Sequence, residues 1–234
     1  MSKGNPTKFY RVNCKQPKNG LMRSLKMKEI DPRQVTERER YKLLAGALIP
    51  RPIAWTLTQN EETGSLNLAP FSFFTVLASE QPLVSLSVMR RRQDGAMKDT
   101  ARNLVTAGEG VIHIVDRAHL EAMNQTAATL QPDESEVDAN GLQTVASSKV
   151  KTPRLAEAAV AFEVKVKSHL PLEADDSQVM TDLFILEVVN FVFRDDLVDV
   201  ANYHVDARKL DPISRLAGSN YGKLGEIISI ERPK

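Results

Sequence analysis

Residues 50–74 constrain the fold more than any other segment, and they read P-R-P-I-A-W-T-L-T-Q-N-E-E-T-G-S-L-N-L-A-P-F-S-F-F. An apolar run over residues 53–58 leads into a polar turn that ends at Gly64, and a second arm returns through residues 67–74. This order predicts a β-hairpin. Pro70 interrupts the second arm, and because proline lacks an N–H it favours an edge, a bulge or a strand start over a central position. The second arm is therefore expected to be irregular, with small residues that leave backbone groups open to a flat polar ligand.

The composition is that of an ordinary globular protein. With 234 residues, 42% of them hydrophobic and 26% charged, the chain can form one domain with a substantial core, with or without extended arms. A formal net charge of +1 gives no general argument for binding nucleic acid or an anionic membrane. Cys14 is the only cysteine, which excludes intrachain disulfides and cysteine-based zinc sites.

The chain shows no targeting or membrane signal. Its N-terminus, M-S-K-G-N-P-T-K, lacks the apolar core of a signal peptide, and no run of 18 apolar residues occurs anywhere. We therefore expect a cytoplasmic protein that does not enter a membrane.

Punctuating residues predict an N-terminal arm and the order of the elements that follow. Residues 1–30 are charged and interrupted by proline, which indicates an arm, and the domain is expected over residues 31–234. Thr36 and Glu39 have the capping-box spacing of a helix start, and Pro50 ends that helix. Further strands are predicted at residues 82–89, 111–115, 161–167 and 183–193, and further helices at residues 98–107 and 117–130.

Three of these segments carry a more detailed expectation. The helix at residues 98–107 should be capped by Asp99 or Thr100 and stopped by Gly108. Residues 161–167 alternate between apolar and charged side chains, which is typical of a half-buried strand. Residues 183–193 are almost continuously apolar, which suits a strand covered on both faces.

The element order favours a mainly β (α+β) protein. Several strands separated by turns, with few inserted helices and little strand–helix alternation, indicate an antiparallel barrel rather than a doubly wound sheet. No Gly-x-Gly-x-x-Gly motif follows a strand, which argues against a Rossmann nucleotide site.

Two segments could bind an anion. In the strand at residues 83–89, Ser85 and Ser87 share one face, and three arginines, 90–92, follow it. The alternative is that these serines and arginines simply face solvent. Lys98 stands at the start of the next helix, where unpaired N–H groups and the helix dipole favour a phosphate. Here the alternative is an ordinary capped surface helix.

Other candidate sites are weaker. The acidic residues 131–141 are expected to form a solvated loop, because the spacing and the glycine of a calcium-binding EF-hand are missing. No pair of histidines has metal-ligand spacing, so no metal site is predicted. His204, which precedes the R-L-A-G-S-N-Y motif of residues 215–221, is the one histidine kept as a possible neighbour of a cofactor or substrate.

Several of these motifs occur together, in the same order, in a known family. The chain resembles the flavin reductase-like, FMN-binding split-barrel family in its motifs P-R-P-I-A-W, N-L-A-P-F-S-F-F, V-S-L-S-V-M-R-R, K-D-T-A-R-N, A-M-N-Q-T-A, G-L-x-x-V-x-S-x-K-V-x-x-P-R and R-L-A-G-S-N-Y. The resemblance covers roughly residues 30–225 and leaves the arm outside. Where the family more often has Gly-Gly, this chain has Ala-Gly at residues 217–218.

The resemblance implies a split β-barrel that holds FMN, or FAD in some members of the family, at a homodimer interface. The cofactor-binding residues that it implies are Trp55, Asn67, Ala69, Phe71, Ser72, Ser85, Ser87, Arg91, Lys98, Asp99, Thr100 and His204. The phosphate would lie among Ser85, Ser87, Lys98 and Thr100, with Arg91 nearby, and the flavin ring would lie against the hairpin. For Trp55, a core anchor whose indole N–H is satisfied within the protein is the alternative.

The resemblance also implies an activity. Flavin reductases of this type pass hydride from NAD(P)H to flavin without an acid, base or nucleophile from the protein, so no catalytic residue is predicted. The reduced flavin could serve a partner monooxygenase. Two other readings stay open, a flavoredoxin-like protein that relays electrons and a non-catalytic FMN-binding protein that stores or senses flavin.

Overall fold

The structure, a computed structural model, describes residues 26–128, 130 and 134–233. Packing divides the chain into two units, residues 1–40 and 41–234. Cys14 and most of the predicted arm lie outside the described residues, so the boundary between arm and domain stays a prediction. A short 3-10 helix, η1 (Pro32–Gln34), precedes helix α1 (Glu37–Ala47). The Thr36 N–H donates to Glu39 Oε2 at 2.9 Å and the Glu39 N–H to Thr36 Oγ1 at 3.3 Å, which confirms the predicted capping box.

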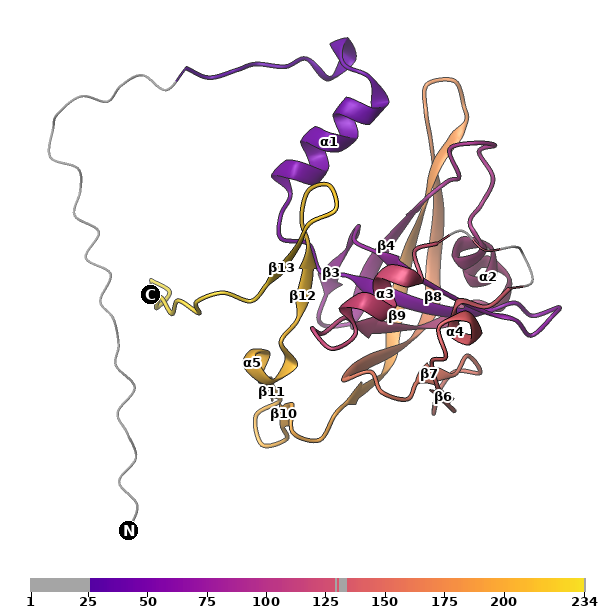
Figure 1. Ribbon diagram of the computed structural model, residues 1–234, viewed down its shortest axis with the longest axis vertical. Helices are drawn as coiled ribbons and strands as arrows, with labels where there is room; N and C mark the ends of the chain where they lie inside the picture. The colour runs from indigo at the N-terminus through magenta and orange to yellow at the C-terminus, as the bar shows by residue number, and fades with distance from the viewer. Residues whose placement is uncertain (1–25, 129, 131–133, 234) are drawn as a thin grey trace, which may run out of the picture. The chain divides into compact units, whose positions relative to one another are not determined.

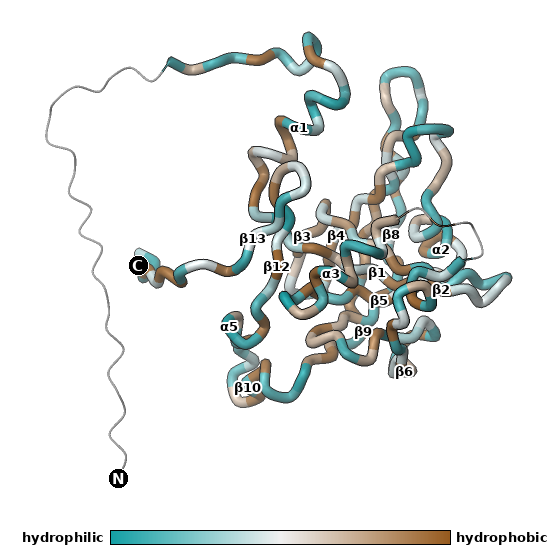
Figure 2. The backbone as a smooth tube through the Cα atoms, viewed as in Figure 1, coloured by the Kyte–Doolittle hydropathy of each residue, from teal (hydrophilic) through white to brown (hydrophobic). Residues whose placement is uncertain are grey.

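The second unit is built on a seven-stranded sheet in which every neighbouring pair is antiparallel (Figure 1). The spatial order is β2-β1-β5-β8-β9-β4-β3. The strands are β1 (Ala54–Gln59), β2 (Leu66–Phe71), β3 (Phe74–Ala78), β4 (Leu83–Met89), β5 (Glu109–Ile114), β8 (Val160–Glu173) and β9 (Val179–Phe193). Figure 2 shows hydrophilic residues at the tip of the long β8–β9 hairpin and hydrophobic ones along the sheet.

Helices and short strand pairs complete this unit. The helices are α2 (Asp99–Ala107), α3 (Leu120–Gln125), α4 (Glu136–Ala139) and α5 (Ala207–Leu210). The two-stranded pairs are β6 (Thr144–Val145) with β7 (Arg154–Leu155), β10 (Val198–Asp199) with β11 (His204–Val205), and β12 (Ile213–Arg215) with β13 (Tyr221–Lys223). Within the described ranges, no helix combines the length and the apolar character needed to cross a bilayer.

The predicted hairpin is confirmed, and it explains why the sheet curls. β1 pairs with β2 from Ala54 opposite Phe71 to Gln59 opposite Leu66, and β2 forms one edge of the sheet, where its proline needs no ladder partner. β3 forms the opposite edge, yet only two residues separate the end of β2 from the start of β3. Since so short a link spans roughly 10 Å, the two edges must approach each other. The sheet is therefore a barrel that stays split between β2 and β3.

β1 is buried on both faces. Ala54 packs in the barrel core with Leu86, Ile112 and Phe184, and Trp55 packs on the other face in a second cluster that includes side chains from α3 and α4. The interior strand β9 was expected to be covered on both faces, but its burial alternates, so that expectation is wrong for the single chain. An unbroken apolar run does not reveal which of its faces a neighbouring element covers.

Two other expectations about the elements need correction. The helix predicted over residues 117–130 is only α3 (Leu120–Gln125), because the Asp116 side chain accepts the His119 N–H just before it and Thr126 ends it. Glu163 was grouped with the solvent-facing charges of β8, but it is fully buried. Its carboxylate accepts the N–H groups of Ser148 and Lys149 at 2.9 and 2.6 Å. A sequence pattern does not show that a distant loop supplies donors to a buried acid.

Candidate flavin site

Two neighbouring cavities open beside the split between β2 and β3. The larger has a volume of about 520 Å³ and the smaller about 240 Å³. Pro70, Phe71, Lys98 and Ala127 line both, so the cavities meet at the end of β2 and the start of α2. The larger volume lies within the range of roughly 300–1,000 Å³ that is common for sites of small molecules and cofactors.

The start of α2 borders both cavities and lacks a side-chain cap. The residue at the N-cap is Lys98, whose ammonium group cannot accept a hydrogen bond, and its side chain makes no capping hydrogen bond. The expected cap, Asp99 or Thr100, is therefore wrong by one or two positions, whereas the expected stop at Gly108 is confirmed by its left-handed φ of 68°. The first-turn N–H groups have no partner within the helix, so they favour an anion.

Lys98 adds a full positive charge to this helix end. Burial lowers the pKa of its amino group, and the nearby positive charge of Arg92 lowers it further. Its Nζ lies 5.8 Å from the centre of the Phe71 ring, and in the described part of the chain it makes no ion pair with an acidic side chain. A partly buried cation without a carboxylate partner is what an anionic ligand would stabilise.

Asn67 and Thr100 are held by the protein itself. The Thr100 hydroxyl donates to Asn67 Oδ1 at 2.7 Å, and Asn67 Nδ2 donates to the Glu136 carboxylate at 3.2 Å. The Leu68 N–H also donates to Glu136, at 3.0 Å. In this structure Thr100 thus has no hydroxyl hydrogen left for a phosphate, and Asn67 ties β2 to both α2 and α4.

Glu136 corrects the expectation of a solvated acidic loop. It lies in α4 and is only 6% exposed, and burial raises the pKa of its carboxyl group while the hydrogen bonds from Leu68 and Asn67 oppose that shift. Residues 131–133 of the predicted loop lie outside the described residues. No group of acidic or histidine side chains that could hold a metal ion occurs among the residues that the structure describes.

The remaining predicted residues divide between the two cavities or lie away from them. Ala69, Arg91 and Asp99 line the larger cavity, and Ser72 and Ser87 line the smaller. Arg91 pairs with Asp94 at 3.3 Å, and Asp99 pairs with Arg102.

Trp55, Ser85 and His204 line neither cavity. Trp55 is 1% exposed, and its indole N–H donates to Thr126 Oγ1 at 2.8 Å, which is the geometry of a core anchor. Ser85 is half-buried within β4, and His204 is exposed on the short strand β11. These three residues therefore carry no ligand-binding role in the site proposed below.

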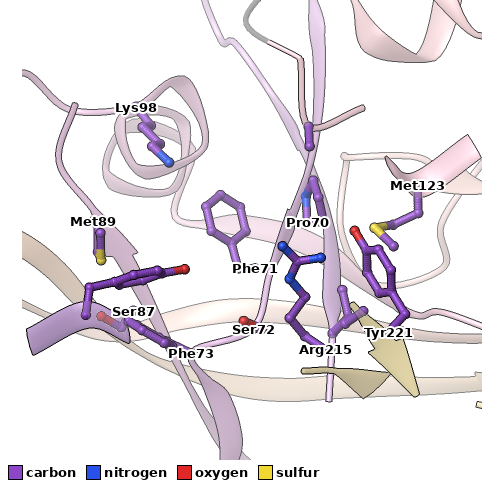
Figure 3. A pocket seen from close by; sticks show the side chains of 13 residues that line it. Pro70, Phe71, Ser72, Phe73, Ser87, Met89, Lys98, Met123, Arg215 and Tyr221 are labelled. Carbon is purple, nitrogen blue, oxygen red and sulfur yellow. The ribbon is translucent and has the colours of Figure 1, made fainter. Parts of the chain in front are cut away.

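The smaller cavity is lined mainly by side chains that were not predicted (Figure 3). Arg215 and Tyr221 form one wall, and Phe73, Met89 and Met123 contribute others. The R-L-A-G-S-N-Y motif contains the first two, so the motif was a usable signal even though neither residue was assigned a role.

Comparison with known proteins decides the family. A family model described as "Flavin reductase like domain" matches residues 46–210. The chain belongs to this flavin reductase-like family. YwrF of Bacillus subtilis is 44% identical over 200 residues, covering 86% of this chain and 96% of YwrF. A relative from Halalkalibacterium halodurans is 42% identical over 205 residues, covering 88% of this chain and 96% of its own.

Solved structures agree with this membership. Nitrilotriacetate monooxygenase component B from Bacillus cereus is 40% identical, with a TM-score of 0.84, and covers 88% of this chain and 100% of its own. The 2-nitrobenzoate 2-nitroreductase NbaA of Pseudomonas fluorescens is 27% identical, with a TM-score of 0.78, and the match covers 88% of this chain and 96% of NbaA. The predicted family and its split-barrel fold are confirmed. Membership makes this flavin reductase-like chain a protein of a flavin-binding, oxidoreductase class.

Proposed function

We propose that this flavin reductase-like protein binds FMN in the larger cavity and catalyses hydride transfer from NAD(P)H to the flavin. One observation carries the proposal. The larger cavity lies between a helix start whose N-cap residue is a lysine and the edge strand β2. A flavin mononucleotide needs both features, a positive site for its phosphate and polar backbone for its ring.

The phosphate would be bound mainly by backbone groups and two cations. Lys98 and the first two residues of α2 line the cavity, and Arg91 lines it as well. Because the Thr100 hydroxyl already donates to Asn67, it would act by fixing β2 against α2. The binding energy would therefore depend more on Lys98 and the helix end than on hydroxyl donors.

The flavin ring would lie along the outer edge of β2. The Leu68 N–H points away from β1 to Glu136, and residues two apart in a strand point to the same side, so Pro70 presents its backbone to that outer edge as well. Having no N–H, Pro70 offers only its carbonyl oxygen there, an acceptor for a ring N–H. At this position the outer edge of β2 therefore offers only an acceptor, whereas any residue other than proline would offer a donor and an acceptor.

The chain would contribute position rather than acid–base chemistry. Bound flavin supplies the hydride acceptor, and the protein would hold the two reactants together and limit their movement. The 40% identity to a monooxygenase component B supports the further proposal that reduced flavin, or its electrons, serve a partner oxygenase. A protein that only relays electrons or stores flavin would have the same flavin site but would not be reduced rapidly by NAD(P)H.

The first test is flavin uptake. We expect purified protein to bind about one FMN per subunit in a spectroscopic titration, because each chain contributes one α2 start and one β2 edge. FAD, titrated in parallel, shows which flavin is preferred. A protein that takes up neither FMN nor FAD would contradict the proposal.

We also propose a homodimer. The outward side chains of β9, Leu183 and Ile185 among them, are only half-buried in the single chain, and Val76 on edge strand β3 is 72% exposed. Apolar surface of this kind is commonly buried between subunits, and two-fold dimers are the commonest oligomers. Light scattering at micromolar concentration should give twice the chain mass of 26.0 kDa. A mass equal to that of one chain would exclude the dimer.

A further inference from the structure

The smaller cavity has walls suited to a flat ring. Most of its apolar side chains are aromatic or thioether groups, which pack well against planar ligands: Tyr41, Phe71, Phe73, Met89, Met123 and Tyr221. At about 240 Å³ it is less than half as large as the cavity proposed for the flavin, so it suits a planar ligand smaller than a flavin nucleotide.

One wall of this cavity carries a cation that the flavin proposal does not use. The Arg215 guanidinium lies 4.5 Å from the centre of the Tyr221 ring, and its Nη2 donates to the Gly218 carbonyl oxygen at 2.5 Å. Within the described part of the chain, Arg215 forms no ion pair with an acidic side chain. Since a guanidinium has five N–H donors, Arg215 retains donors for a ligand.

The hairpin that carries Arg215 is held firmly. Strand β12 pairs with β13, and the Tyr221 hydroxyl donates to Asn124 Oδ1 at 2.9 Å, which fixes the ring beneath the guanidinium. Arg51 and Arg215 exchange two backbone hydrogen bonds, of 3.1 and 2.8 Å, and Arg51 Nη2 donates to the Leu216 carbonyl oxygen at 3.2 Å. Arg215 is thus a cation set in place before any ligand arrives.

Arg215 and Lys98 reach the smaller cavity from different elements. Figure 3 shows the Phe71 ring between the Lys98 amino group and the Arg215 guanidinium. Phe71 also lines the larger cavity, so it stands where the two cavities meet. Lys98 therefore borders both cavities, whereas Arg215 borders the smaller cavity and not the larger one.

We propose that the smaller cavity binds the second reactant, a planar ring that carries a negatively charged group, and that Arg215 selects it by binding that group. The inference rests on the proposed function in assigning the flavin to the larger cavity. Two kinds of compound share this chemistry, the mononucleotide half of a nicotinamide nucleotide and an aromatic carboxylate. In either case Arg215 is a specificity-determining residue, and its neighbour Tyr221 orients it.

The test uses matched ligand pairs that differ in the anion. Isothermal titration of the FMN-loaded protein would compare nicotinamide mononucleotide with nicotinamide riboside, and benzoate with benzamide. Hydrogen bonds to charged groups imply that the anionic member of the correct pair binds roughly 10- to 150-fold more tightly. Arg215→Gln should abolish this preference, and Arg215→Lys should retain part of it. Arg208→Gln, which changes an exposed arginine on α5 that lines neither cavity, should leave it intact.

The outcomes separate this inference from the proposed function. FMN affinity should be unchanged in Arg215→Gln, which also shows that the variant is folded. A preference in the first pair identifies a nicotinamide nucleotide as the ligand, and one in the second pair identifies an aromatic carboxylate, even if NAD(P)H proves inert. If neither pair shows a preference, or if Arg215→Gln keeps it, the inference is overturned, even if NAD(P)H reduces the flavin.

Discussion

Replacing Lys98 by methionine is expected to weaken FMN binding by roughly 10- to 150-fold, the loss that follows from removing a hydrogen bond to a charged group. Methionine keeps the apolar stem beside Phe71 but removes the charge from the start of α2. Because riboflavin lacks the phosphate, its affinity should barely change. Fluorescence titration of both flavins measures the difference directly.

The control for this prediction is Lys165→Met, which removes an exposed charge on β8 that lines neither cavity. It keeps the net charge equal to that of Lys98→Met and should leave both flavin affinities as they are. Equal losses for FMN and riboflavin in Lys98→Met would place the phosphate away from the start of α2. Equal losses for FMN in the two variants would indicate a general charge effect.

Acidification from about pH 6.5 to about pH 4 is expected to cost the fold about 3 kcal/mol through His113 alone. This side chain is fully buried on β5, and burial lowers its pKa from 6.5 to about 4, although its hydrogen bond with the Trp55 carbonyl acts in the opposite direction. Its Nε2 accepts the Leu155 N–H at 3.0 Å, so Nε2 must be unprotonated and Nδ1 carries the hydrogen.

The sign of this change in stability with pH follows from proton uptake by His113. The unfolded chain binds a proton at this histidine below pH 6.5, whereas the folded chain does so only near pH 4, so the unfolded state is favoured as the pH falls through that range. Urea unfolding of wild type and His113→Gln at several pH values tests this. The variant should be less stable at neutral pH and should lose less stability on acidification.

His119 is the matched control because its shift has the opposite sign. Its hydrogen bond to Asp116, at 2.7 Å, raises its pKa, so its contribution to stability is present at low pH and is lost as the pH rises through the raised value. Substituting His119 should therefore make the loss of stability on acidification steeper, not shallower. If His113→Gln follows the wild-type slope, His113 titrates normally and the buried geometry is wrong.

The parts of the fold that could be predicted depend on local rules. Pro70 in the second arm of the hairpin predicted that β2 lies at an edge of the sheet. The two-residue link between β2 and β3 then brings the two edges of the sheet together. Thr36, Glu39 and Gly108 marked helix ends correctly because capping and left-handed backbone are properties of a few adjacent residues.

The parts that could not be predicted depend on distant partners. Glu136 and Glu163 look like surface acids in the sequence, but backbone N–H groups from other segments donate hydrogen bonds to them. These hydrogen bonds offset the free-energy cost of burying the two carboxylates. Likewise, nothing local shows that Trp55 faces α3 rather than the ligand. Arg215 and Tyr221 reach the smaller cavity only because the β12–β13 hairpin is held against Arg51, more than 160 positions earlier in the chain.

The central claim is that NAD(P)H reduces a flavin bound in the larger cavity, and anaerobic stopped-flow measurement tests it most directly. Protein loaded with FMN is mixed with NADH or NADPH, and the visible absorbance of the oxidised flavin is followed. We expect rapid bleaching with at least one nucleotide, at a rate that rises with nucleotide concentration and then saturates, and slower bleaching at limiting nucleotide in Arg215→Gln if a nicotinamide nucleotide is the ligand of the smaller cavity. Bound FMN that keeps its colour with both nucleotides would contradict the claim.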